Sequence, residues 1–235
     1  MSGPVADVVF ARRAAYLESA DTLVLADLHL GRAEDSNVQF PVGEREDVLD
    51  RLGTLLERFA PETVVVAGDL LHAFGRFSPS VAESVGTVER LVADAGAAFV
   101  VTPGNHDALI EKVFDGPTPA EHRLPDGTVV YHGHERPEKT AGRYVFGHDH
   151  PAIEIEGKRH PCFLYGEGVY RSADVLVLPA FTRLARGVAV NGAYGSDLMS
   201  PVLTRGIETY RPLVYDADTE ETLAFPPLTQ FREML

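Results

Sequence analysis

The sequence is poor in several residue types that would point to a particular setting. It has one cysteine, Cys162, so the chain cannot form an internal disulfide, and a reducing cytoplasm is the simplest expectation. It has no tryptophan, and no apolar run approaches the ~20 residues that a membrane-spanning helix needs. The N-terminus lacks a basic segment followed by an apolar stretch, so we expect no signal peptide. These absences predict a cytoplasmic protein that does not enter a membrane.

Lysine is also scarce. Only three of the 21 basic residues are lysines, 35 residues are acidic, and the formal net charge is −14. A dense acidic surface with few lysines stays hydrated in concentrated salt, so we expect a halophilic source. The same charge repels polyanions and argues against broad binding of nucleic acids. That objection weakens where salt screens the field or where bound metal ions supply positive charge.

The first half of the chain alternates short apolar runs with longer amphipathic segments. A length of 235 residues and a hydrophobic fraction of 45% suit one domain over residues 1–235. Buried strands are predicted at 22–26, 63–67 and 97–102, and helices at 43–60 and 79–95, the second helix with Ser78 as its candidate cap. This order indicates a parallel sheet with covered faces.

The second half is richer in strands. Asp126-Gly127 and Glu156-Gly157 are hairpin turn signals, and residues 174–178 form another apolar run that predicts a buried strand. We therefore predict an α/β fold, a four-layer α-β-β-α sandwich of two stacked mixed sheets flanked by helices.

Five short motifs carry the candidate chemistry. In chain order they are Asp27-Leu28-His29, Gly68-Asp69, Gly104-Asn105-His106-Asp107, His132-Gly133-His134 and Gly147-His148-Asp149-His150. The first two arise readily by chance. In contrast, Gly-His-x-His is expected only ~0.03 times at this composition, and Gly-Asn-His-Asp fewer than ~0.001 times. The later motifs and the ordered set are therefore the informative signal.

The motifs lie where a sheet would bring them together, because C-terminal strand ends are the edge at which α/β folds build their sites. The residues just beyond apolar runs are Asp27, Asp69, Asn105, His132 and His148. In an extended chain, residues two apart point the same way, so we expect Asp27 to act with His29, and His148 with His150.

These side chains suit a pair of divalent metal ions. Imidazole, carboxylate and one amide oxygen suit Mn²⁺, Fe²⁺ or Zn²⁺ rather than Ca²⁺ or a thiolate-type zinc site. Of the three ions we expect Mn²⁺. The charge of two such ions exceeds that of Asp27, Asp69 and a bridging hydroxide together. The surplus positive charge favours an anionic phosphodiester as substrate.

With these residues in view, the chain resembles the calcineurin-like metallophosphoesterase superfamily, all five of whose motif blocks are present. The segments Ala26 to Gly31, Gly68 to His72, Gly147 to Pro151 and Leu178 to Phe181 further resemble a small archaeal group. That group is related to SbcD-type and Mre-type repair nucleases and to DNA-ligase-associated phosphoesterases. DNA-repair partners are an expectation of this resemblance only.

The resemblance implies a role for each motif residue. Asp27, His29, Asp69 and His150 would hold one metal ion, and Asp69 would bridge to a second ion held by Asn105, His132 and His148. A metal-bridging hydroxide would attack phosphorus in line. His106 would face the phosphate and protonate or stabilise the leaving oxygen.

His72 separates branches of the superfamily. Phosphoprotein phosphatases usually continue the second motif as Gly-Asp-x-x-Asp-Arg-Gly, whereas this chain has Leu70-Leu71-His72 after Asp69. A histidine here resembles the nuclease branch, in which it supports the catalytic histidine. The alternative for His72 is a turn residue after a strand.

Several assignments keep an alternative. Within His-Gly-His, the family favours His132 as the ligand and leaves His134 as a substrate or outer contact. Arg32 and Arg183 could reach a substrate phosphate, although such arginines more often pair with surface acids.

Three functions follow, in order of preference. The first is a phosphodiesterase and candidate nuclease acting on DNA or a nucleotide. The second is a hydrolase of small nucleotides or phosphomonoesters on the same scaffold. The third is a non-catalytic protein-binding scaffold, which is least favoured because such scaffolds tend to lose ligands and none is missing here.

Overall fold

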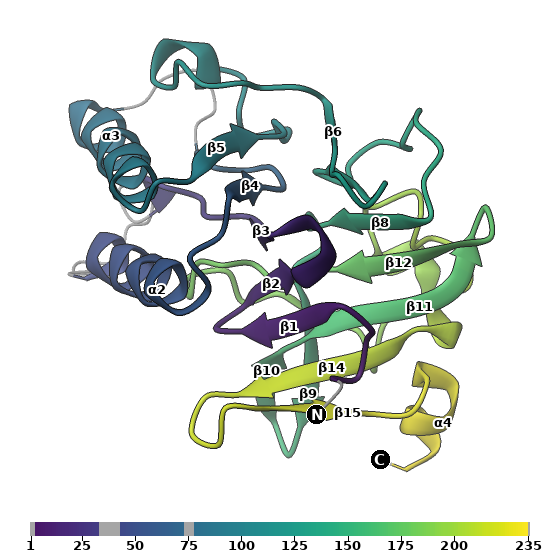
Figure 1. The fold of residues 1–235 in the computed structure, drawn as a ribbon. Coiled ribbons are helices and arrows are strands. Elements are labelled where there is room, and N and C mark those ends of the chain that lie inside the picture. The colour runs from purple at the N-terminus through teal and green to yellow at the C-terminus, as the bar shows by residue number, and fades with distance from the viewer. Residues whose placement is uncertain (1–2, 33–42, 73–77, 235) are drawn as a thin grey trace.

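The computed structural model describes residues 3–32, 43–72 and 78–234 (Figure 1). Its first sheet has five strands in the order in which they occur along the chain. They are β1 (Val8–Ala11), β2 (Ala14–Leu17), β3 (Thr22–Leu25), β4 (Thr63–Val66) and β5 (Ala98–Val101). The β1–β2 and β2–β3 pairs are antiparallel, whereas β3, β4 and β5 run parallel. The parallel strands confirm the three that the sequence predicts.

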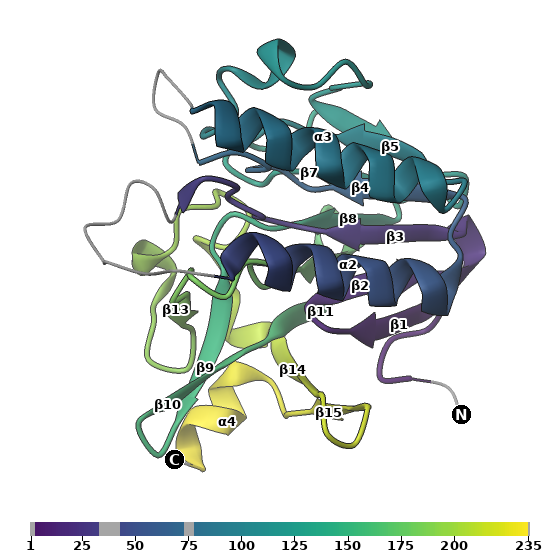
Figure 2. The ribbon, with the colours of Figure 1, turned by 90° about the vertical axis from the view of Figure 1, so that its left-hand side faces the viewer.

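Two long helices cover one face of this sheet (Figure 2). They are α2 (Glu44–Phe59) and α3 (Pro79–Asp94), close to the predicted ranges. Ser78 caps α3 as expected, since its Oγ accepts a hydrogen bond from the Val81 N–H at 3.4 Å. Proline at the first helical position costs no hydrogen bond there.

Strict alternation of side chains places β3 between two cores. Leu23 and Leu25 pack with the helices, whereas Val24 packs in the layer between the two sheets. A strand that is apolar on both faces gains burial from both sides, at roughly 25 cal/mol per Å² of apolar surface. This is why β3 reads in the sequence as an unbroken apolar run.

The second sheet has seven strands, in the order β15-β14-β11-β12-β8-β7-β6. Their bounds are β6 (Glu121–Arg123), β7 (Val129–Tyr131), β8 (Arg143–Phe146), β11 (Phe163–Tyr170), β12 (Ala173–Val177), β14 (Arg211–Asp216) and β15 (Glu221–Ala224). β7, β8 and β12 run parallel and the other neighbours antiparallel. The sheet is therefore mixed, as predicted.

A third core lies on the outer face of the seven-stranded sheet, where Tyr144, Phe146 and Val177 meet Leu203 and Phe231. The covering layer contains the short helix α4 (Leu228–Glu233), 3-10 helices at Gly195–Asp197 and Ile207–Thr209, and a small sheet of β10 (Lys158–Pro161), β9 (Pro151–Ile155) and β13 (Val188–Ala189). Two further 3-10 helices span Glu18–Ala20 and Ile110–Lys112. The layers together form the predicted α-β-β-α sandwich.

Both predicted hairpins are present. Asp126-Gly127 joins β6 to β7, and Glu156-Gly157 joins β9 to β10 with positive φ at both turn residues. The β1–β2 hairpin and the three-stranded sheet have no counterpart in the sequence prediction. Within the described ranges, every helix is too short or too polar to cross a bilayer.

Candidate metal centre

The five motifs meet at one edge of the sandwich. Asp27, Asp69 and Asn105 follow β3, β4 and β5, and His132 and His148 follow β7 and β8. The sheets are stacked, so the C-terminal ends of parallel strands from both layers reach the same place. Each layer therefore supplies candidate donors to the same edge.

The local backbone differs from the prediction. The extended geometry expected for Asp27 with His29, and for His148 with His150, is wrong, because all four residues have left-handed φ values of 56°, 49°, 70° and 47°. Asp69 shares this conformation, with φ of 47°. Such a conformation costs a non-glycine residue free energy, and strained residues of this kind cluster at functional sites. Tight turns rather than strand alternation thus aim these side chains inward.

Two motif glycines make room for the carboxylates. A Cβ added to Gly104 would lie 2.1 Å from Asp69 Oδ1, and one added to Gly147 would lie 2.3 Å from Asp27 Oδ2. Any side chain at either position would displace a buried carboxylate. The Gly-Asn and Gly-His pairs therefore have a steric cause that sequence reasoning missed.

Asp69 lies at the centre of the cluster. Its Oδ2 is 3.8 Å from His29 Nε2, 3.6 Å from His132 Nε2 and 4.0 Å from His106 Nε2. Its Oδ1 accepts a hydrogen bond from the His106 backbone N–H at 3.0 Å, which fixes the carboxylate. One carboxylate oxygen thus faces imidazoles from three different motifs.

Asp27 joins the first motif to the fifth. Its Oδ2 accepts the His148 backbone N–H at 2.9 Å and lies 3.5 Å from His150 Nε2. Its Oδ1 lies 3.7 Å from His132 Nδ1 and accepts no hydrogen bond from the described residues. A buried carboxylate oxygen without a donor is costly, and a cation would offset that cost.

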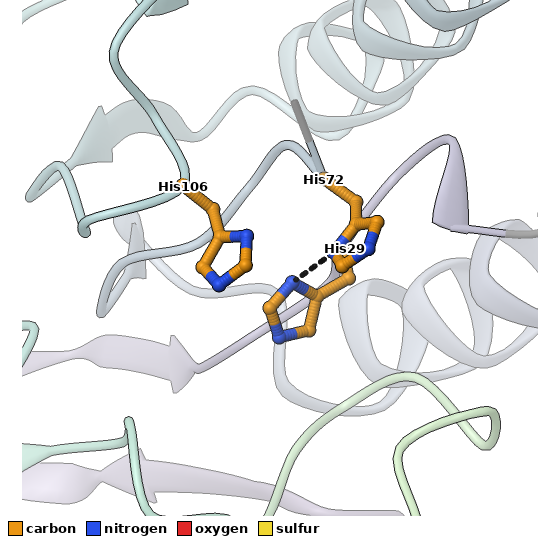
Figure 3. A group of neighbouring side chains, drawn as sticks. All are labelled: His29, His72 and His106. Carbon is orange, nitrogen blue, oxygen red and sulfur yellow. Dashed lines mark hydrogen bonds between the residues drawn. The ribbon is translucent and has the colours of Figure 1, made fainter. Parts of the chain in front are cut away.

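The histidines form two neighbouring groups. In the first, His29 Nε2 lies 3.3 Å from His150 Nε2, and His29 Nδ1 lies 3.4 Å from His72 Nδ1 (Figure 3). The ring of His106 stacks on that of His72, with ring centroids 5.0 Å apart. His72 is therefore part of the cluster and not an isolated turn residue.

In the second group, His132 Nε2 lies 3.0 Å from Asn105 Oδ1, and the His132 and His148 ring centroids are 4.7 Å apart. His132 is buried, whereas His134 is exposed, with its ring centroid 5.1 Å from that of His132. His134 lies with His132 on the wall of a pocket of about 320 Å³. These positions suit His132 as the inner donor and His134 as an outer contact.

Burial sets the charge of the donors. It lowers the pKa of His29 and His148 to about 3 and that of His132 to about 4. These imidazoles are neutral at pH 7 and have a lone pair to offer. Burial, assisted by the charge of Asp27, raises the pKa of Asp69 to about 8. A cation beside Asp69 would displace that proton.

Two motif aspartates hold the surrounding loops. Asp107 accepts hydrogen bonds from the backbone N–H groups of Leu70, Leu71 and Gly104, and so ties the second motif to the third. Asp149 accepts the N–H groups of Met199 and Ser200. Backbone N–H groups thus engage both carboxylates, which support the loops around the site.

The two candidate arginines differ in position. The charge of Arg32 helps to lower the pKa of His106, after burial and His72, so Arg32 lies within electrostatic range of the histidine cluster. Arg183 instead pairs with Asp47 of α2, with Nε and Oδ1 3.2 Å apart. Of the two, Arg32 remains the candidate contact for a substrate phosphate at the cluster.

The donor set fits divalent metal ions. Potential ligand atoms of Asp27, His29 and His150 lie within 4.8 Å of one another, as do those of Asp27, Asp69 and His132. Neutral imidazoles, a donor-free carboxylate oxygen and an amide oxygen suit Mn²⁺, Fe²⁺ or Zn²⁺. The residues present can therefore hold the ions that the sequence predicts.

Comparison with known proteins agrees with this geometry. A sequence profile described as calcineurin-like phosphoesterase matches residues 21–157, more than half of the chain and all five motifs. The chain belongs to the calcineurin-like phosphoesterase family. This phosphoesterase is thus a hydrolase of phosphate esters, and its family uses divalent metals.

A solved structure shares the fold of this calcineurin-like phosphoesterase. The nuclease MPE of Pseudomonas putida has 24% sequence identity and a TM-score of 0.67, over 95% of this chain and 98% of that one. The phosphoesterase Yfce of E. coli has 15% identity and a TM-score of 0.45, over 88% of this chain and 98% of that one. No curated protein matches the chain.

Proposed function

We propose that this phosphoesterase hydrolyses phosphodiester bonds with a dinuclear metal centre. The observation that carries the proposal is the position of Asp69, whose Oδ2 lies between His29 at 3.8 Å and His132 at 3.6 Å. A carboxylate between two groups of donors can serve both. One ion would be held by Asp27, His29, Asp69 and His150, and the other by Asp69, Asn105, His132 and His148.

The metals and the side chains divide the chemistry. Two bound divalent ions supply a hydroxide nucleophile near neutral pH and Lewis-acid stabilisation of the developing charge. Mn²⁺ is the proposed resident ion, because carboxylate and amide oxygens suit it, and Fe²⁺ and Zn²⁺ are the alternatives that the imidazoles also suit. The protein contributes His29, His132 and His148 as imidazoles that are neutral above about pH 4, and it excludes water around the buried carboxylates.

His106 is the proposed proton donor to the leaving oxygen. Its side chain is 18% exposed, so it borders the open side of the cluster, and its Nε2 lies 4.0 Å from Asp69 Oδ2. A proton held there neutralises the alkoxide as the phosphorus–oxygen bond breaks. His72, stacked on the same ring, would position His106 rather than touch the substrate.

A diester, in DNA or a nucleotide, is the proposed substrate. The second motif has no arginine to clamp the extra charge of a monoester, and His72 stands in the cluster instead. The fold is shared with a protein described as a nuclease, which makes single-stranded DNA a substrate worth testing. Because both sheets supply the site together, we also propose that residues 1–235 act as one catalytic domain.

A small-nucleotide or phosphomonoester hydrolase is the second candidate. The pocket of about 320 Å³ beside His132 and His134 favours it, since that volume suits a small ligand. The non-catalytic scaffold receives no support from a site whose donors are complete.

A substrate panel tests these choices. Metal-loaded enzyme is assayed on a model diester, a model monoester and single-stranded DNA, with His106→Asn as a matched control. We expect diester turnover to exceed monoester turnover, and His106→Asn to lose it while retaining metal. Preferential monoester hydrolysis would favour the second candidate, and equal rates in His106→Asn would remove the proposed proton donor.

A further inference from the structure

A second pocket contains an unusual concentration of positive charge. Its volume is about 270 Å³, and four arginine side chains line it: Arg12, Arg13, Arg51 and Arg183. They come from the turn between β1 and β2, from α2 and from the segment after Thr182 (Figure 2 looks onto α2 and the β1–β2 hairpin). In a chain of net charge −14, a cluster of four arginines is unexpected and requires a physical explanation.

Specific contacts hold the arginine side chains in this pocket, so the cluster is not a chance gathering of long side chains. Arg13 Nη1 donates to the backbone carbonyls of Ala180 at 3.1 Å and Thr182 at 2.6 Å. The Arg51 guanidinium lies 4.1 Å from the centroid of the Phe181 ring. Arg12 and Arg13 both have positive φ, of 46° and 73°, a conformation that neither side chain favours. The hairpin turn thus holds two adjacent arginines in a backbone conformation that costs free energy.

The positive charge of this pocket is only partly neutralised. Asp47 is the one carboxylate of the described residues that pairs with the cluster, with Arg51 at 2.7 Å and Arg183 at 3.2 Å. Among the residues that the structure describes, neither Arg12 nor Arg13 forms an ion pair with a carboxylate. Burial lowers the pKa of Arg13 to about 10, and the charges of Arg51 and Arg183 add to this. An anion in the pocket would offset the repulsion.

The pocket is a close neighbour of the metal centre. The Thr182 N–H donates to the Asp27 carbonyl at 3.3 Å, while the Thr182 carbonyl accepts from Arg13. A single residue therefore separates a proposed metal ligand from the arginine cluster, on the order of 10 Å. At roughly 3.4 Å per nucleotide, a strand covers that distance in about three nucleotides.

We propose that this arginine pocket binds a phosphate group of the substrate strand remote from the bond that is cleaved. The inference rests on the proposed diesterase function and specifies its substrate as an oligonucleotide. Arg12, half-buried and without a paired carboxylate, is the side chain most available to that phosphate. Tyr215, half-buried on the pocket wall, adds an aromatic ring against which a sugar or base can pack. The positive charge of the pocket would also attract the DNA backbone locally, although the net charge of the protein is negative.

The test compares two substrates that differ in length. Kinetics of Arg12→Gln are measured on a one-phosphate model diester and on a single strand of about 15 nucleotides. Loss of one charged contact should raise the KM of the oligonucleotide about tenfold relative to that of the model diester. The slope of log KM against log salt for the oligonucleotide should fall by about one. Arg12→Lys should restore much of the affinity, and Arg205→Gln, an exposed arginine elsewhere, should change neither value.

A binding measurement separates failure of this pocket from failure of the proposed reaction. Chelator-treated wild type and Arg12→Glu are titrated with the labelled strand, with and without inorganic phosphate. Weaker binding by Arg12→Glu supports the pocket even if no diester is turned over. Equal affinity in both proteins overturns it. If inorganic phosphate stabilises wild type but not Arg12→Glu while strand affinity is equal, the site takes a free small anion and the proposal is likewise overturned.

Discussion

The ring of His72 lies parallel to that of His106, with planes 16° apart and centroids 5.0 Å apart. His72 Nδ1 is also 3.4 Å from His29 Nδ1. His72 therefore contacts both the proposed proton donor and a proposed metal ligand. This arrangement gives His72 a way to influence catalysis without reaching the substrate.

Substitution at these two positions should have graded effects. His106→Asn should lower kcat roughly 10²–10⁴-fold, since a general acid contributes that much. His72→Gln should lower kcat less and move the alkaline limb of the pH–rate profile to higher pH, because the charge of His72 helps to lower the pKa of His106, the proposed acid. Both variants should keep their metal, measured by elemental analysis. An unchanged pH profile in His72→Gln would reduce His72 to a packing role.

Asp69 should govern the binding of both ions. Asp69→Asn removes the shared carboxylate charge, so we expect the variant to bind neither ion at concentrations that saturate wild type. His148→Ala should instead bind one ion, because His148 belongs to only one of the proposed donor groups. Stoichiometry is read by calorimetric titration with Mn²⁺, and Asp94→Asn on the exposed face of α3 serves as the control. Retention of both ions by Asp69→Asn would contradict a bridging role.

The sequence predicts the layers better than the turns. Runs such as residues 22–25 are apolar on both faces, so burial alone identifies β3, and the same holds for β4 and β12. The left-handed φ of Asp27 and His148 could not be foreseen, because aspartate and histidine have no strong preference for that region without tertiary support. The motif spacing nevertheless identifies which side chains converge.

The arginine pocket illustrates a second limit of sequence reasoning. Arg12, Arg51 and Arg183 are far apart in the chain and share no motif, and only the packing of α2 on the β1–β2 hairpin unites them. The sequence offers Arg183 as a candidate contact for a substrate phosphate at the metal centre, yet it pairs with Asp47. Contacts of this kind depend on topology, which local patterns do not encode.

Asp107 should be a major contributor to stability. It is 2% exposed, and its carboxylate accepts the N–H groups of Leu70, Leu71 and Gly104. Asp107→Ala leaves three donors unpaired, at roughly 1–3 kcal/mol each before relaxation, so we expect a loss of about 3–5 kcal/mol. Asp107→Asn keeps one acceptor oxygen, so its free energy of unfolding should lie between those of wild type and Asp107→Ala. Urea unfolding measures both. A loss within 0.5 kcal/mol or so for Asp107→Ala would show that water replaces the carboxylate.

The metal-free protein should be most stable near pH 6.5. Below that pH the unfolded chain protonates His29, His132 and His148, whereas the folded chain keeps them neutral down to about pH 3–4, so the free energy of unfolding falls as pH falls. Above it, the folded state still holds a proton on Asp69 up to about pH 8 while the unfolded state does not, so the free energy of unfolding falls by about 2 kcal/mol as pH rises.

Urea midpoints of chelator-treated protein at pH 5, 6.5 and 8.5 or so test this maximum. Asp69→Asn has no carboxyl proton to lose, so it should abolish the decline on the alkaline side while the acidic decline remains. Saturating metal should remove the alkaline decline in wild type as well, because the ions take the place of the Asp69 proton. Stability that rises steadily to pH 8.5 in the chelated wild type would mean that Asp69 is already ionised there, and the site would then bind metal without releasing a proton.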